Sequence, residues 1–390
     1  MTITEEKTCL CAMGHIFGFD PGTAISLLNT FGSARELFNL PEKEADSLFG
    51  AYSKYKGRIC RKEVDLAYEE LSALSDKGYN FTGWGEDDYP ALLKECEDAP
   101  CGIYIRSDTP PENLWNGRRF ISIVGTRDLS PYGMEWCERL VHGIAQAGAE
   151  PVIVSGLALG TDICAHRAAL KEGLPTIGVM ATGPETVYPS RHSLIAEKIS
   201  RSEGCALITD FPPGTPPLPI HFLRRNRIIA GLSEAVILTE SKSRGGGMNT
   251  ARLAFSYNRS VFAFPGRLDD LKSQGCNMLI KEKIAEPLVD VEGFITDLSL
   301  SGVKKVRKSK SGGLQIDRLR EIYGDSNGGQ IEKMSEILEH VHRARGITIG
   351  ELCDETGYGY STVAGLVSML EAEGLICVDI LQRCTININL

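Results

Sequence analysis

This chain of 390 residues has no long apolar run, and its first residues contain no apolar run either. No stretch approaches the roughly 20 apolar residues that a membrane-spanning helix needs. Met1–Thr8 is polar and acidic, which is unlike a secretory signal. We therefore expect a cytoplasmic protein that has no membrane partner.

Cysteine pairs of the metal-binding kind are also missing. The sequence contains 12 Cys, but no C-x-x-C pair occurs, and Cys9-x-Cys11 alone is a weak signal. The other cysteines are scattered through apolar segments, where a reduced Cys behaves as a small hydrophobe. The sequence therefore predicts no structural zinc site.

The sequence also lacks the motifs of the common nucleotide-using and hydrolytic enzymes. Gly125-Thr126-Arg127-Asp128-Leu129 follows an expected strand but is not a G-x-G-x-x-G fingerprint, and no Walker A sequence occurs. Ser155 has no G-x-S-x-G frame. His166 lies four residues after Asp162, a spacing that we interpret as a hydrogen bond along a helix rather than a metal or acid–base site. No nucleophile, metal set, cofactor site or general base is evident, so we predict binding and no enzymatic activity.

From Arg119 onward, short apolar strands alternate with helix-compatible segments. The expected helices are 132–147, 162–172 and 190–202. The expected strands are Phe120–Val124, Val152–Val154, Thr176–Met180, Ala206–Thr209, Ala235–Thr239 and Val261–Phe264. Continuous apolar strands separated by helices predict an α/β fold, an extended Rossmann-like core whose mostly parallel sheet is buried on both faces.

Positive charge gathers between His221 and Arg267, although the formal net charge of the chain is -9. This stretch contains eight basic residues and two acidic ones. Its Arg244-Gly245-Gly246-Gly247 run lies between a strand and a helix expected from Asn249. Guanidinium groups and the amides of a helix N-terminus both suit phosphate oxygens. The alternative is a solvated basic face around an ordinary turn.

Ligands of such sheets bind beyond the carboxyl ends of the strands. Three glycine-containing turns are expected at that edge, and the Arg225-Asn226-Arg227 element is expected near them. The predicted phosphate-binding residues are Gly125, Thr126, Arg127, Ser155, Gly156, Arg225, Asn226, Arg227, Gly245, Gly246, Gly247 and Thr250. Arg127 or Arg225 could instead pair with a buried carboxylate such as Asp162 or Asp210.

Smaller segments flank the core, which we place at residues 81–298. Residues 1–80 predict a helical domain of the SAM or helix-hairpin-helix type, with Ser33 as a helix N-cap. Residues 299–330 predict a basic linker. Residues 331–390 predict a winged helix whose third helix, 360–373, has no Lys or Arg. Because recognition helices usually carry cations, we interpret this last domain as a protein-contact or regulatory module.

The order of motifs in the core resembles the DprA/Smf family of DNA-processing proteins. The resemblance spans about residues 87–290. The matching residues are Ile123–Arg127, Ser130, Tyr132-Gly133, Ser155–Ala158, Gly160, Asp162, Ala165-His166, Tyr188-Pro189, Phe222, Arg225–Ser233, Gly245–Ala251, Phe264–Gly266, Gly275, Asn277 and Leu279-Ile280. The resemblance implies a homodimeric protein that protects incoming single-stranded DNA during natural transformation and loads the RecA recombinase onto it.

Some positions depart from the family pattern. Leu159 stands where many members have Arg or Lys, and Ile208-Thr209-Asp210 replaces the usual Ile-Ser-Glu. Glu240-Ser241 replaces the usual Glu-Ala, and Gly246–Ala251 varies a Ser-Gly-Ser-Leu-x-Thr-Ala turn. These changes leave the exact phosphate contacts open.

Two other functions are compatible with parts of the sequence. The core also resembles the LOG group of nucleotide phosphoribohydrolases, but no Glu follows Gly245–Ala251 as that group's motif requires. Transcriptional regulation through the C-terminal domain is a third hypothesis, and the shortage of cations in that domain disfavours it.

Overall fold

The computed structural model describes residues 1–50, 52–148, 150–298, 300, 328–343, 347–373, 375–378 and 383–386. It divides into two compact units, Met1–Lys304 and Lys305–Leu390. The expected linker at 299–330 lies almost wholly outside the described residues. None of the described helices is long and apolar enough to cross a membrane.

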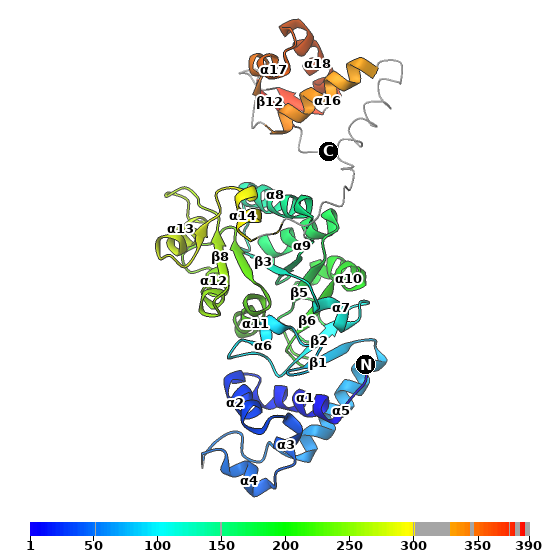
Figure 1. Ribbon diagram of the computed structural model, residues 1–390, viewed down its shortest axis with the longest axis vertical. Coiled ribbons are helices and arrows are strands. Elements are labelled where there is room, and N and C mark those ends of the chain that lie inside the picture. The colour runs from blue at the N-terminus through cyan, green and yellow to red at the C-terminus, as the bar shows by residue number, and fades with distance from the viewer. Residues whose placement is uncertain are drawn as a thin grey trace. The chain divides into compact units, whose positions relative to one another are not determined.

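The first unit is built around a sheet of nine strands in the order β1-β2-β6-β5-β4-β3-β7-β8-β9 (Figure 1). The strands are β1 (Asn80–Gly83), β2 (Gly102–Arg106), β3 (Phe120–Val124), β4 (Val152–Ser155), β5 (Thr176–Val179), β6 (Ala206–Thr209), β7 (Ala235–Leu238), β8 (Ser260–Ala263) and β9 (Glu286–Pro287). Neighbours from β6 to β9 pair in parallel, whereas β1 and β2 are antiparallel additions at one edge. The predicted α/β core with a mostly parallel sheet is confirmed.

Helices cover both faces of this sheet. The helices of the core are α6 (Ala91–Lys94), α7 (Pro111–Trp115), α8 (Pro131–Ala147), α9 (Thr161–Glu172), α10 (Ser193–Arg201), α11 (Pro219–Leu232), α12 (Gly246–Ser256), α13 (Gln274–Lys281) and α14 (Val291–Asp297), with a 3-10 turn at Ser190–His192. Ile121 and Ile123 of β3 pack with α8, α9 and α14. Phe120 and Val124, which point to the other face, pack with α11 and α12. This alternation explains why the central strands are apolar throughout.

The N-terminal helices share the apolar core of the α11 face. They are α1 (Glu5–Phe17), α2 (Pro21–Phe31), α3 (Ala34–Phe38), α4 (Glu42–Ser47) and α5 (Arg61–Asp76). Helix α1 contacts β1 and β2, and its buried Leu10 and Met13 belong to the same cluster as Ile228 of α11. Ser33 accepts a hydrogen bond from the Glu36 amide, as predicted for an N-cap. Residues 1–80 therefore pack as part of the first unit.

The described residues of the second unit form three helices and a small antiparallel sheet. Its elements are α16 (Gly328–Arg343), β10 (Ile347–Thr348), α17 (Ile349–Thr356), α18 (Tyr360–Ala372), β11 (Ile376–Val378) and β12 (Arg383–Ile386). The strand order is β10-β12-β11. Buried residues such as Leu338, Leu352 and Leu366 give this unit its own core. Thr348 and Glu351 form a capping box that begins α17.

Candidate nucleic-acid interface

The chain changes direction across the sheet between β3 and β7. Strands β4, β5 and β6 extend the sheet on one side of β3, and β7 and β8 extend it on the other. At such a switch point the loops after the two central strands diverge and leave a crevice beyond their carboxyl ends. Here those loops are Gly125–Ser130 after β3 and 239–245 after β7. The two predicted turns that contain Arg127 and Gly245 therefore flank the switch point.

Glycine allows the two loops to approach closely. A Cβ on Gly247 would lie 3.1 Å from Cα of Gly125, and a Cβ on Gly125 would lie 2.4 Å from Oγ1 of Thr161. The glycines of these turns thus bring three loops together at the crevice. The chain enters α12 at Gly246, three residues before the predicted start at Asn249, so Gly246 and Gly247 form the first turn of that helix.

The helices that follow β3, β4 and β7 point their N-termini at this edge, and two of them are already occupied by a carboxylate. Glu240, which is buried, accepts hydrogen bonds from the amide and hydroxyl of Ser130, the N-cap of α8. Asp162 lies in the first turn of α9 and accepts a hydrogen bond from the Ala158 amide. Helix α12 has no side-chain cap and no acidic residue in its first turn, and Gly246 is exposed. Its N-terminus is therefore the one suited to an external anion.

Exposed cations stand around the N-terminus of α12. Lys242 and Arg244 are exposed just before α12, and Arg127 is exposed in the loop after β3. No acidic side chain in the described part of the chain forms an ion pair with any of these three residues. By contrast, Lys272 at the same edge is neutralised by Asp128, 2.9 Å away.

Aromatic rings lie beside Arg127. Its guanidinium is 5.1 Å from the centroid of the Phe222 ring, within the range of a cation–π contact. Phe222, half-buried near the start of α11, lies 5.5 Å from the ring of Tyr188. Tyr188 is exposed in the segment after β5. Arg127 is the one member of this row that was among the predicted site residues; Phe222 and Tyr188 were missed. Aromatic residues within and near a basic stretch were the sequence signal that could have identified them.

The Arg225-Asn226-Arg227 element lies beneath this edge rather than on it. Arg225 is 3% exposed, and its guanidinium donates to the carbonyls of Gly156, at 2.7 Å, and Val179. Glycine at position 156 leaves room for that guanidinium, because a Cβ there would lie 2.5 Å from it. Burial lowers the pKa of Arg225 to about 10, while the negative charge of Asp162 opposes this shift and the charge of Arg127 adds to it.

Arg227 is held in an ion pair. It is 5% exposed, and its Nη2 atom lies 2.6 Å from Oδ2 of Asp210. Arg224 contacts the same oxygen at 2.7 Å and lies between the rings of Phe19 and Phe211. Pairing with a buried carboxylate was the alternative for Arg127 or Arg225, but neither forms an ion pair with Asp162 or Asp210, and the arginines bound to Asp210 are Arg224 and Arg227. The geometry gives Arg227 a structural role.

Other predicted residues are buried in the scaffold of the turns. Ser155 is fully buried and donates its hydroxyl to the carbonyl of Ile123, 2.6 Å away. Asn226 bonds with Arg225 and Asn249, and Thr250 is 2% exposed. Half-buried Thr126 accepts hydrogen bonds from Thr161 through its carbonyl. Of the predicted residues, Arg127 and Gly246 are exposed, and Gly125, Thr126 and Gly245 are partly accessible.

We expected a hydrogen bond between His166 and Asp162, but His166 bonds to a different residue. Its Nδ1 atom lies 2.7 Å from Oγ1 of Thr176, which in turn donates to the carbonyl of Ile153. Burial, together with the charges of Arg225 and His192, lowers the pKa of His166 to about 3. A buried neutral histidine in this network supports packing between α9 and the sheet.

A hollow of about 640 Å³ lies elsewhere on the first unit. Its lining includes Asp108, Glu112, Arg118, Arg201 and Glu203 and none of the predicted site residues. Acidic and basic groups alternate around it. Its mixed charge makes it a poorer polyanion site than the carboxyl edge.

Comparison with known proteins agrees with this geometry. Residues 80–299 match the family model described as DNA recombination-mediator protein A. DNA processing protein DprA of Bacillus subtilis is 36% identical over 231 residues, which are 58% of this chain and 75% of that protein. DNA processing protein DprA of Streptococcus pneumoniae is 38% identical over 197 residues, which are 50% of this chain and 67% of that protein.

Solved structures extend the likeness to the fold. The X-ray structure of DNA processing protein A from Streptococcus pneumoniae matches with a TM-score of 0.64 and 28% identity, covering 76% of this chain and 99% of that one. A structure of DNA processing protein A from Helicobacter pylori, which describes its single-stranded DNA binding mode, matches with a TM-score of 0.50 and 29% identity, covering 57% and 95%. From the matched family model and these relatives, the chain belongs to the DNA recombination-mediator protein A family.

Proposed function

We propose that this protein binds single-stranded DNA along the carboxyl edge of its sheet. The observation that carries the proposal is the exposed, unpaired Arg127 beside the rings of Phe222 and Tyr188. Single-strand-binding proteins combine cations that hold the backbone with aromatic rings on which bases stack. Base faces are hidden in a duplex, so such a row favours single strands.

The N-terminus of α12 supplies the second part of the site. Its amides, with Lys242 and Arg244 beside them, receive a phosphate while Arg127 holds a neighbouring one. Gly125 and Gly247 keep the two loops close enough for one strand to contact both. Arg225 acts from below by fixing the turn at Gly156. We therefore assign Arg225 to positioning and Arg127 to direct contact.

Fluorescence anisotropy with a labelled single-stranded oligonucleotide and its duplex, across a salt series, tests this proposal. We expect preference for the single strand and a steep loss of affinity with salt, because phosphate contacts release counterions. Arg139→Ala is the matched control for Arg127→Ala. Arg139 also lies over an aromatic ring, Trp136, but is paired with Glu135 on α8. Equal affinity for duplex at every salt concentration would contradict the proposal.

The role in the cell that we propose is protection of incoming single strands during natural transformation and loading of RecA onto them, as a cytoplasmic homodimer. The support is family membership and the relatives named as DNA processing proteins. RecA's DNA-dependent ATP hydrolysis on strands coated with single-strand-binding protein tests the loading step. We expect the wild-type protein to shorten the lag before ATP hydrolysis. With Arg127→Ala, much of that lag should return. Light scattering after size-exclusion chromatography measures the dimer.

We propose no catalytic activity. The Gly245–Ala251 turn is not followed by the Glu that a phosphoribohydrolase motif requires. Incubation with nucleoside monophosphates, with chromatography of the products, tests this directly. Release of free base by the wild-type protein, but not by Arg127→Ala, would favour the enzymatic alternative.

A further inference from the structure

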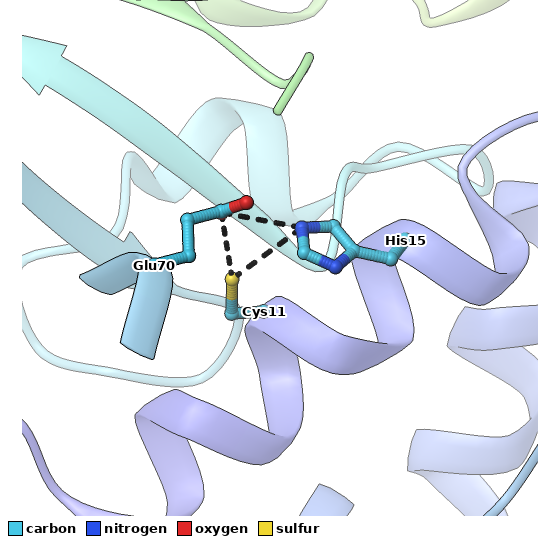
Figure 2. Close-up of side chains that lie close together, drawn as sticks. All are labelled: Cys11, His15 and Glu70. Carbon is cyan, nitrogen blue, oxygen red and sulfur yellow. Dashed lines mark hydrogen bonds and ion pairs between the residues drawn. The ribbon is translucent and has the colours of Figure 1, made fainter. Parts of the chain in front are cut away.

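A cluster of four polar side chains lies far from the carboxyl edge, where the N-terminal helices meet the sheet. Cys11 and His15 are four residues apart on α1 and so project from the same side of that helix. Glu70 reaches them from α5, and the three side chains converge in Figure 2. Tyr104 of β2 contacts all three. It is the only such group of potential metal ligands found in the described part of the chain.

The distances among the donor atoms describe a small tetrahedron. Sγ of Cys11 lies 3.9 Å from Nε2 of His15 and 3.5 Å from Oε1 of Glu70, and these last two atoms are 3.2 Å apart. The hydroxyl of Tyr104 lies 3.3 Å from the sulfur, 3.2 Å from the nitrogen and 2.6 Å from the carboxylate oxygen. Zinc bond lengths of about 2.3 Å to sulfur and about 2.0–2.2 Å to nitrogen and oxygen give tetrahedral edges of roughly 3.3–3.6 Å. Only small movements are needed to match them.

The donor types select the metal. Thiolate and imidazole are preferred by zinc and disfavoured by magnesium and calcium, which take oxygen ligands. Cys11 is 1% exposed, whereas the side chains of His15 and Glu70 are 20% and 19% exposed, so an ion can enter from their side. Burial, together with the charge of Glu70, raises the pKa of Cys11 well above its usual value. Because the thiolate is the ligand, zinc must displace this proton when it binds.

We propose that Cys11, His15 and Glu70, with Tyr104 as the fourth donor, form a zinc site that ties helices α1 and α5 to strand β2. The sequence predicted no zinc site because C-x-x-C was the pattern sought, whereas these donors come from three separate elements. Binding of zinc would displace the proton of the Cys11 thiol and replace the hydrogen bonds within the cluster. Because the ligands belong to elements brought together only by folding, the metal would stabilise the first unit.

Metal content and cobalt spectroscopy test the site. The full-length protein is stripped with a chelator, dialysed against Zn²⁺, and analysed by mass spectrometry for metal per chain. We expect one zinc in the wild-type protein and a higher melting temperature than in the stripped protein. Replacement by Co²⁺ should give a thiolate-to-cobalt charge-transfer band. Both signals should be lost in Cys11→Ser, which keeps a polar atom for folding, and in His15→Ala.

Cys9→Ser is the matched control, because Cys9 is equally buried two residues earlier on α1 but lies outside the cluster. It should retain the zinc and the cobalt band. Tyr104→Phe should weaken binding at least tenfold, because it removes one of four donors. Absence of stoichiometric zinc from the wild-type protein, or zinc retained by a folded Cys11→Ser protein, would overturn the proposal and leave the cluster as a hydrogen-bonded contact. None of these readouts involves DNA, so the outcome is independent of the proposed function.

Discussion

Arg225 and Arg227 of α11 are 3% and 5% exposed, whereas Arg127, Lys242 and Arg244 are exposed in loops at the carboxyl edge of the same sheet. The buried arginines are bound to carbonyls and to Asp210. The exposed cations form no ion pair with an acidic side chain among the described residues. The comparison shows that cations near one edge of the sheet can divide between a buried framework and a binding surface. Partners and exposure, rather than sequence position, decide which cations are free to meet a phosphate.

Removing the carboxylate of Asp210, which pairs with buried arginines, should have the largest effect on stability. Asp210→Ala leaves Arg224 and Arg227 without the oxygen that both contact, and loss of one partner of a buried pair costs about 3–5 kcal/mol. Chemical denaturation measures the free energy of unfolding. Asp269→Ala, which breaks an exposed pair with Arg267, is the control and should leave the midpoint unchanged. A wild-type midpoint for Asp210→Ala would break the comparison.

Lowering the pH should destabilise the fold through another buried basic side chain near these arginines, that of His166. The pKa of His166 is lowered to about 3 in the folded protein, whereas the usual value is near 6.5. Between these two pH values the unfolded chain binds a proton at His166 and the folded chain does not. Stability is therefore lost as pH falls through this window, by about 2 kcal/mol between pH 8 and pH 5 from this residue alone. His166→Asn, which retains a group for Thr176, should lack that component. Denaturation at both pH values gives the difference between the two proteins.

Substitution of the exposed Arg127 should weaken DNA binding without lowering the stability of the fold. Arg127→Ala should weaken binding of single strands roughly tenfold, regardless of sequence, and lower the salt slope by about one. Arg127→Lys should recover only part of the affinity, because the bidentate fork is lost. Arg225→Ala should instead lower the melting temperature, with its folded fraction retaining affinity. Normal melting with lost affinity in Arg225→Ala would place that residue on the binding surface.

Removal of the second unit should have the smallest effect. The exposed cations of the proposed site all belong to the first unit, and α18 contains no Lys or Arg. A chain that lacks residues 331–390 should keep single-strand affinity within about tenfold of the full chain, a difference of less than about 1.4 kcal/mol. Anisotropy with the same oligonucleotide checks this. A larger loss would give the second unit a direct part in DNA binding.

The sequence predicted the sheet well because each central strand is a short, mostly apolar run. Phe120–Val124 and Ala206–Thr209 match β3 and β6 in both bounds. The candidate site was harder, because sequence shows charge but not exposure. Arg127 and Arg225 look equivalent in a sequence, and only the fold places the carbonyls of Gly156 and Val179 around Arg225. The pairing of Arg227 with Asp210 joins residues whose separation of 17 positions has no local pattern.

The shared core of the N-terminal helices and the sheet also bears on how the chain assembles. Cys11 on α1 meets Tyr104, 93 positions later, and Tyr104 pairs with Thr209 of β6. Helix α1 has partners nearby in sequence, in α5, β1 and β2, whereas β6, which continues the sheet beyond β2, lies much further along the chain. Contacts so distant in sequence slow folding, because the chain must close long loops before they form. We therefore expect the pairing of β2 with β6, which joins the N-terminal helices to the rest of the sheet, to be a late step in folding.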